Sequence, residues 1–180
     1  FEAGDQALLW SEALERARTL EELQALTPDT ARHAVIFASQ LQRAGHQERL
    51  LPWLAWARER FDAAPESAQL WEHEARVRLQ RRELAEAEAA SAEVSRRAPD
   101  ALSSHLLRAD VLQALGRGNE AVEVLEALGA RFLGNVELAF ALARLQVDLG
   151  LTRRARESLQ QVSPFVSNLA QRAQLFMLEG

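Results

Sequence analysis

The sequence predicts an all-α fold, an α-α superhelix of stacked helix pairs. Two observations predict it: a helix-favouring composition and an internal repeat. Of the 180 residues 48% are hydrophobic and 26% are charged, whereas there are only eight Gly, five Pro and no Tyr. This composition favours helix over sheet. A chain of this length can bury about 70% of its extended surface, so we expect residues 1–180 to form a single domain without metal or disulfides.

The repeat has a period of 34 residues, at which small and turn residues superpose when the chain is aligned with itself. The superposed positions are Gly116 and Gly150, Pro65 and Pro99, Leu125 and Leu159, and two alanine columns, Ala75, Ala109, Ala143 and Ala87, Ala121, Ala155. Apolar residues recur at spacings of three and four around the glycines, so each repeat is predicted to be two amphipathic helices joined by a turn. The alanine columns predict places where helix axes approach closely.

Helix boundaries are predicted from caps and breakers. Gly116 and Gly150 supply the left-handed residue that ends a helix. Thr19 and Glu22 have the spacing of a capping box that starts a new short helix, and the alternative is that Thr19 lies inside a longer helix. Because a proline beyond the first turn costs about 3 kcal/mol, we expect the helix that contains Pro52 to begin near Leu50 or Leu51 and to end near Ala63. The candidate N-caps of later helices are Asp100, Asn119, Asn135 and Thr152, with Ser163 before Pro164.

One repeat carries the residue types of a known motif. Trp71, Ala75, Ala87 and Pro99 stand where the tetratricopeptide repeat family has Trp, Gly, Ala and Pro, and the sequence resembles that family over roughly residues 31–180. It departs from the family's Leu, Tyr and Phe at Glu74, Arg78 and Ser91. The resemblance implies a right-handed solenoid of helix-turn-helix repeats. Its expected parts are an irregular N-terminal cap at 1–30, repeats at 31–66, 67–100, 101–134 and 135–163, and a lone first helix at 164–180.

On this framing the first helices of the repeats line a concave groove, which is an extended surface for a peptide or helix. The predicted groove positions are Glu72, Arg76, Gln80, Leu106, Asp110, Gln113, Phe140, Arg144 and Asp148. Their mixed charges and apolar side chains suit an amphipathic or mixed-charge segment of a protein partner better than a polyanion. The chain has no Lys, so we do not expect the Lys-based carboxylate clamp of some family members. Ordinary solvated surface is the competing interpretation.

The charge balance and the residue inventory exclude several other classes of function. All 21 basic residues are Arg and the net charge is −5, which disfavours nucleic acid and anionic membranes as partners. No apolar run approaches the ~20 residues of a membrane span. The absence of Cys excludes thiolate chemistry but leaves cytoplasm and periplasm both open.

The sequence also lacks the motifs of catalysis and of metal or cofactor binding. The four His residues are scattered, and there is no HExxH, GxGxxG or Walker spacing. We therefore expect no catalytic, cofactor-binding or metal-binding residues. The leading hypothesis is a non-catalytic scaffold or adaptor. The alternatives are the repeat domain of a larger polypeptide, such as a transferase or an envelope-assembly factor, and a module that associates with itself through the C-terminal helix.

Overall fold

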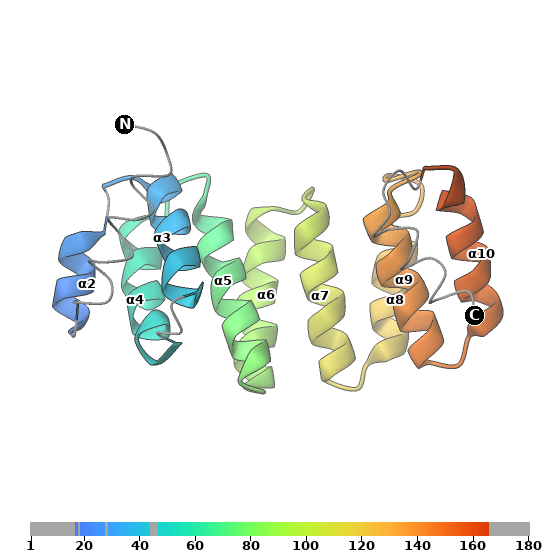
Figure 1. The fold of residues 1–180 in the computed structure, drawn as a ribbon, viewed down its shortest axis with the longest axis horizontal. Coiled ribbons are helices and arrows are strands. Elements are labelled where there is room, and N and C mark those ends of the chain that lie inside the picture. Colours follow the sequence, from blue (N-terminus) through green and yellow to red (C-terminus); the bar gives the residue numbers. More distant parts are fainter. Residues whose placement is uncertain (1–16, 18, 28, 44–46, 166–180) are drawn as a thin grey trace. The chain divides into compact units, whose positions relative to one another are not determined.

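The computed structural model describes residues 17, 19–27, 29–43 and 47–165, and in these residues the regular structure is helical, with no strand. This confirms the predicted all-α class. The helices, labelled in Figure 1, are α2 (Leu20–Leu26), α3 (Ala31–Arg43), α4 (Gln47–Arg60), α5 (Ser67–Gln80), α6 (Leu84–Arg97), α7 (Leu102–Ala114), α8 (Gly118–Glu126), α9 (Val136–Asp148), α10 (Thr152–Val162) and the 3₁₀ helix η1 (Ser163–Phe165). Within the described residues, none of these helices combines the length and the apolar character that spanning a membrane requires.

The chain forms two compact units, Phe1–Ala98 and Pro99–Gly180. In the first unit α3 packs against α4 and α5 packs against α6, and α5 also contacts α3 and α4. Phe37, Trp53 and Leu70 are fully buried in its core. The ring of Trp53 lies 5.2 Å from that of Phe37, and its indole Nε1 donates a hydrogen bond of 2.8 Å to Thr27 Oγ1. The buried indole of Trp53 thus packs against an aromatic ring, and its N–H group has a hydrogen-bond partner.

In the second unit α7 packs against α8 and α9 packs against α10, and α9 also contacts α7 and α8. Figure 1 shows α9 in front of α8 in this unit. The core is made by fully or almost fully buried Leu112, Leu125 and Leu145. Each hairpin therefore buries apolar surface against the next hairpin of its own unit, as expected when neighbouring repeats supply the core.

Three turns between paired helices have the same geometry. Arg82, Gly116 and Gly150 have φ angles of 62°, 77° and 75°. In each turn the amide of this residue bonds to the carbonyl three residues back, and the next amide bonds to the carbonyl five residues back. This is the Schellman motif. It confirms the helix-ending role predicted for the two glycines, and it adds Arg82, which the search for glycine missed.

The two alanine columns are buried. Ala75, Ala109 and Ala143 are 0%, 2% and 0% exposed, and Ala87, Ala121 and Ala155 are 0%, 0% and 1% exposed. In the first column the three helices are α5, α7 and α9, and in the second they are α6, α8 and α10. This confirms that the columns lie where helices pack closely.

The predicted limits of the helix around Pro52 were wrong. Helix α4 begins at Gln47 and ends at Arg60, so Pro52 lies inside it. The expected penalty is about 3 kcal/mol. Leu50, Trp53 and Leu54 are fully buried on the same helix, and full burial of such side chains stabilises by about 1.5–3 kcal/mol each. Tertiary packing therefore outweighs the local preference.

The predicted caps had mixed outcomes. The Thr19 and Glu22 capping box is present at the start of α2, and Asn135 Oδ1 accepts a hydrogen bond of 2.9 Å from Leu138 N at the start of α9. The predictions of N-caps at Asp100, Asn119 and Thr152 were wrong. The N-caps of α7, α8 and α10 are Ala101, Arg117 and Leu151. Asp100 instead pairs with Arg131 at 2.5 Å. Ser163 and Pro164 lie in η1, and the helix predicted at 164–180 lies outside the described residues after Phe165.

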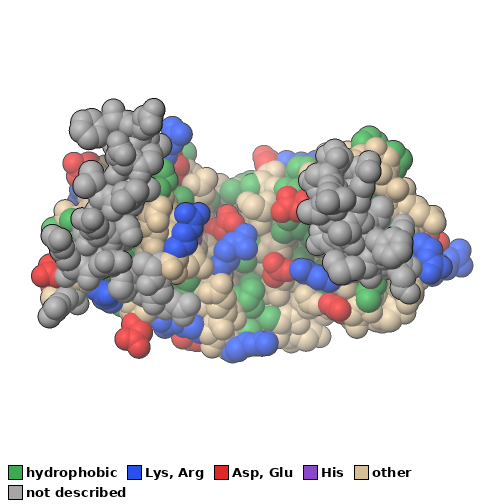
Figure 2. All heavy atoms as spheres, viewed as in Figure 1, with side chains coloured by type: hydrophobic (Ala, Val, Ile, Leu, Met, Phe, Trp, Pro, Cys, Tyr) green, Lys and Arg blue, Asp and Glu red, His purple; other side chains and the backbone are tan. Residues whose placement is uncertain are grey.

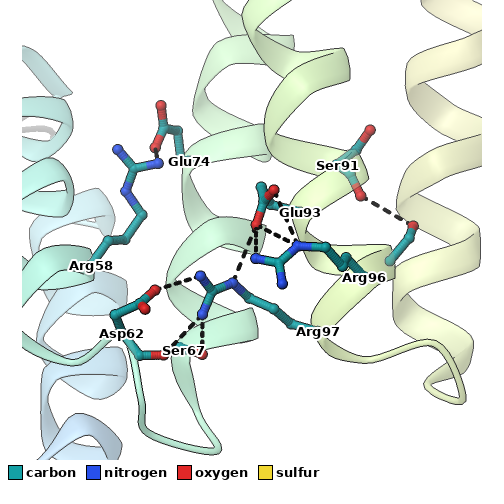
Figure 3. A network of polar contacts seen from close by, with 9 residues as sticks. Arg58, Asp62, Ser67, Glu74, Ser91, Glu93, Arg96 and Arg97 are labelled. Carbon is teal, nitrogen blue, oxygen red and sulfur yellow. Dashed lines mark hydrogen bonds and ion pairs between the residues drawn. The ribbon is translucent and has the colours of Figure 1, made fainter.

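The first unit is crossed by a network of arginines and carboxylates (Figure 3). Arg58 of α4 lies 2.5 Å from the carboxylate of Glu74 in α5, and its guanidinium lies 3.7 Å from the centroid of the Trp71 ring. Arg97 of α6 donates to Ser67 Oγ at 2.9 Å and pairs with Asp62. The ion pairs of Glu74 with Arg58 and with Arg78 explain why a carboxylate is tolerated at this position, where the family resemblance implies Leu, since a buried charge requires a charged partner.

Candidate functional site

The polar residues predicted to line a groove in the second unit lie on its two first helices, α7 and α9. We call this surface the α7/α9 face and define it by Leu106, Asp110, Gln113, Arg144 and Asp148. Arg144 Nη2 donates to Asp110 Oδ1 at 2.9 Å, and Gln113 Nε2 donates to Asp148 Oδ2 at 2.5 Å. Both bonds join α7 to α9. The structure therefore brings four of the predicted polar side chains together in two pairs, about one helical turn apart along the helices.

An apolar surface accompanies these two polar pairs. Leu106 of α7 and Ala141 of α9 are half-buried and pack against the core of the second unit. Val147, in the last turn of α9, is exposed. A surface that offers apolar contact between hydrogen-bonding groups has the make-up of a protein-binding surface, in which apolar contact supplies affinity and polar contact supplies orientation.

Phe140 does not lie on this surface as predicted. Its side chain is 8% exposed and packs with Ala143, Ala155 and Leu159 between α9 and α10. An apolar side chain of α9 can face either the predicted groove or the partner helix of the hairpin. Burial of the large Phe140 ring against α10 stabilises the hairpin. Phe140 is therefore a core residue and has no place in the candidate site.

The remaining predicted residues lie on α5 of the first unit. Arg76 Nη2 lies 2.8 Å from Glu72 Oε1, so these two side chains pair along one helix, not across two. Gln80 is exposed and lines an open hollow of about 470 Å³ together with Ser39, Gln42 and Arg43 of α3. The candidate surface of the first unit is thus the α3/α5 face, defined by Glu72, Arg76, Gln80 and the three α3 residues.

Sequence reasoning missed one residue that joins α3 to α5. His73 Nε2 lies 3.3 Å from Ser39 Oγ, and His73 Nδ1 lies 3.4 Å from Gln42 Oε1. Burial lowers the pKa of His73, an effect that Glu72 opposes and Arg76 reinforces. The imidazole is therefore neutral at pH 7. The available signal was the spacing, since Ser39 and His73 are one repeat apart.

On the face shown in Figure 2, the described residues have acidic, basic and hydrophobic side chains next to one another, without a field of one sign. In the described ranges no three His, Asp or Glu side chains gather as a metal site. The second unit also has a hollow of about 270 Å³ lined by side chains such as Leu125, Phe132, Leu138 and Val162. Nothing in the sequence had indicated that hollow.

Solved structures show what this arrangement resembles. One is YrrB, a TPR protein with an unusual peptide-binding site, which matches with a TM-score of 0.62 and 17% identity over 90% of this chain and 80% of that chain. Another is TTC0263, a thermophilic TPR protein of Thermus thermophilus, with a TM-score of 0.65 and 18% identity over 83% of this chain and 81% of that chain. The chain has a tetratricopeptide-repeat fold. MamA AMB-1 is a third similar structure, with a TM-score of 0.56 and 16% identity over 89% of this chain and 94% of that chain.

In this tetratricopeptide-repeat fold α3, α5, α7 and α9 are the first helices of successive pairs, and α4, α6, α8 and α10 are the second helices. No protein-family model matches the sequence, and no curated protein is a significant match. The sequence copies are degenerate at large packing positions such as Glu74, Arg78 and Ser91, whereas the small positions keep their places. The small positions preserve the helix packing, because close approach of two helices depends on them.

Proposed function

We propose that the chain is a non-catalytic scaffold that binds a peptide or helix of a partner protein on its first-helix faces, chiefly on the α7/α9 face. The observation that carries the proposal is the pair of bonds between α7 and α9, Arg144 to Asp110 and Gln113 to Asp148. These groups are at the surface, so a bound segment can exchange hydrogen bonds with them at low desolvation cost.

The apolar contribution comes from the half-buried Leu106 and Ala141 beside these pairs. An amphipathic segment that lies along α7 and α9 would cover these side chains and meet charges of both signs. The similarity to YrrB supports the proposal, because that protein shares the fold and has a peptide-binding site. In the first unit, the hollow on the α3/α5 face offers amide, hydroxyl and guanidinium groups to the same kind of ligand.

The test is a selection of peptides from a random library on the intact chain, followed by affinity measurement with purified variants. Arg144→Glu breaks the pair on the α7/α9 face, and Arg76→Glu changes the α3/α5 face. The matched control is Arg153→Glu, because Arg153 is an exposed arginine of α10 that also pairs with a carboxylate, that of Glu157.

We expect peptide binding to fall in Arg144→Glu, and to fall further in the double variant with Arg76→Glu, while Arg153→Glu binds as the wild type does. Circular dichroism and thermal unfolding establish that the variants are folded. If the folded double variant binds every selected peptide as well as the wild type does, the proposal is wrong.

Self-association is a second candidate function. Leu133 and Phe165 are 85% and 59% exposed, and Phe165 lies against Gly134, at 3.3 Å from the position of an added Cβ. Leu133 directly precedes Gly134, so an exposed apolar residue lies on each of the two segments that meet there, as is typical of a surface that another protein covers. Light scattering over a range of concentrations separates the two functions: a mass that doubles in the wild type but not in Leu133→Ser supports self-association.

A further inference from the structure

We propose that the α7/α9 face selects partner segments that carry a basic side chain, Lys or Arg, and that this side chain binds at Asp148. The inference rests on the proposed function and names the chemistry of the partner. It follows from three observations: the unbalanced charge of the face, the place of Asp148 in its helix, and the apolar residues that precede and follow Asp148 in the sequence.

The first observation is the charge balance of the face. Asp110 and Arg144 neutralise each other. Asp148 receives a hydrogen bond from Gln113, whose amide is neutral, and within the described ranges no arginine forms an ion pair with Asp148. Arg144 lies one turn before Asp148 on the same side of α9, but its Nη2 is bonded to Asp110. A negative charge at Asp148 is thus left over.

A second carboxylate on α9 has the same sign. Glu137 is exposed and lies seven residues before Arg144, a spacing that places both residues on one side of a helix. In the part of the chain that the structure describes, Glu137 has no ion-pair partner either. The uncompensated charges along this side of α9 are therefore negative at both ends, which favours a basic occupant over an acidic one.

The second observation is that Asp148 is the last residue of α9 and that the last turn of α9 contains no basic residue. The free carbonyl groups at the C-terminus of a helix carry partial negative charge, so a carboxylate there is disfavoured and a cation is favoured. The corresponding end of α3 carries Arg43. In α3 the positive charge of Arg43 therefore offsets the partial negative charge of the free carbonyl groups. In α9 a cation from a partner would do the same.

The third observation is that the residues before and after Asp148 in the sequence are apolar and partly exposed. Val147 and Leu149 are 39% and 38% exposed. Lys and Arg have long aliphatic stems that pack on apolar surface while their charged ends reach a polar group. Val147, which directly precedes Asp148 in the last turn of α9, therefore offers exposed apolar surface to such a stem, whereas Leu149 lies against Gly118 of α8.

The experiment uses the full chain as bait for a random peptide library, with the wild type and Asp148→Asn selected in parallel. Asn has nearly the same shape as Asp and keeps an oxygen that can accept the hydrogen bond from Gln113, so the substitution removes the charge alone. The control is Glu157→Gln, because Glu157 is also an exposed carboxylate but lies on α10, where it pairs with Arg153.

We expect peptides selected by the wild type to be enriched in Lys or Arg at one position, and peptides selected by Asp148→Asn to lack this enrichment. Fluorescence anisotropy with one selected peptide should show binding about two- to fivefold weaker to Asp148→Asn, the effect of an exposed ion pair, and a smaller salt dependence. Replacement of the basic residue of the peptide by Met should abolish the difference between the two proteins. Glu157→Gln should bind as the wild type does.

Two other outcomes separate this inference from the proposed function. If the selected peptides bind Asp148→Asn and the wild type equally, but lose affinity for Arg144→Glu, the basic-partner inference is wrong and the proposed function stands. If no peptide is selected, or if binding survives Arg144→Glu together with Arg76→Glu, both are wrong.

Discussion

Asp110 of α7 and Arg144 of α9 form a 2.9 Å ion pair across two successive first helices of the second unit, and they are 34 residues apart in the sequence. Residues one repeat apart occupy the same place on successive first helices, so their side chains meet side by side. The pair is a surface feature, since the side chains of Arg144 and Asp110 are 56% and 37% exposed. It presents both charges to solvent between two helices, where a bound segment can reach them.

The first prediction concerns the stability that this pair provides. Because exposed ion pairs contribute about 0.2–1 kcal/mol, Arg144→Ala should lower the free energy of unfolding by less than about 1 kcal/mol. Urea denaturation measures this change. A loss of several kcal/mol would mean that the pair holds α7 and α9 together and is unavailable to a ligand, contrary to the proposed function.

The second prediction concerns the left-handed residue of the turns. Arg82 has a φ of 62° at the position where the next two repeats have glycine. The left-handed conformation strains a residue that has a Cβ by about 1–2 kcal/mol, and substitution by glycine removes this strain. Glycine also has more conformational freedom in the unfolded chain, which offsets part of the stabilisation. Arg82→Gly should therefore raise the free energy of unfolding by up to about 1 kcal/mol, measured by urea denaturation.

The reverse substitution is the matched control. A Cβ added at Gly116 would meet no atom within 4 Å, so Gly116→Ala tests the backbone alone. It should destabilise by about 1 kcal/mol. If Arg82→Gly and Gly116→Ala change the free energy of unfolding in the same direction, the φ angle does not determine the choice of residue at these turns.

The third prediction concerns a buried hydroxyl. Ser104 of α7 is fully buried, and its Oγ has no hydrogen-bond partner among the described residues. The residues one repeat away in either direction are Leu70 and Leu138. Because an unsatisfied buried hydroxyl costs about 1–3 kcal/mol, Ser104→Ala should stabilise the protein, by about 1 kcal/mol. A thermal melt that moves to lower temperature would show that the hydroxyl is satisfied.

The fourth prediction concerns pH. Burial lowers the pKa of His73 below its ordinary value of 6.5. Well above pH 6.5 the side chain is neutral in both the folded and the unfolded state, so its contribution to the free energy of unfolding does not change with pH. As the pH falls below about 6.5, the unfolded chain takes up a proton more readily than the folded chain, so stability is lost. The charged groups that act on His73 are Glu72 and Arg76.

The wild type should therefore lose more unfolding free energy between about pH 7.5 and about pH 5.5 than His73→Gln does. Gln keeps a hydrogen-bonding group that can reach Ser39 or Gln42 but does not titrate. Equal losses in the two proteins, measured by urea denaturation at each pH, would show that His73 is not responsible.

The sequence predicted features that depend on one or two residues within a repeat. The turns at Gly116 and Gly150 follow from a need for positive φ, and burial of the alanine columns follows from close helix approach. The cap at Asn135 was also predicted, because a side-chain oxygen before an apolar-periodic segment has a local partner in the next turn. Local chemistry determines these features, so local patterns reveal them.

Features that depend on tertiary packing were not predictable in this way. Pro52 lies within α4 because burial of Leu50, Trp53 and Leu54 outweighs its local penalty. Phe140 could have faced either side of α9, and it is part of the core. Arg82 was not identified because only glycine signals a left-handed turn. Asn119 and Thr152 were one or two residues from the true caps, an offset typical of helix ends.

The candidate surfaces were only partly predictable. Periodicity placed Asp110, Arg144 and Asp148 on first helices, and the structure has them there. Periodicity did not say which side chains pair, because a partner on the neighbouring helix depends on how far the helices are offset. The bond from Gln113 to Asp148 spans 35 residues and not 34. The contribution of His73 to the α3/α5 face was missed although Ser39 lies one repeat before it, because the 34-residue spacing alone does not show that two side chains bond.

The measurement that most directly tests the central claim is a two-dimensional amide NMR titration of the labelled full chain with a peptide selected as above. Binding along α7 and α9 predicts chemical-shift changes concentrated at the amides of residues 106–113 and 141–148, with weaker changes in the second helices. Changes concentrated in α8 and α10, with those of α7 and α9 unaffected, would show that the peptide binds on the opposite side of the hairpins and would contradict the proposed function.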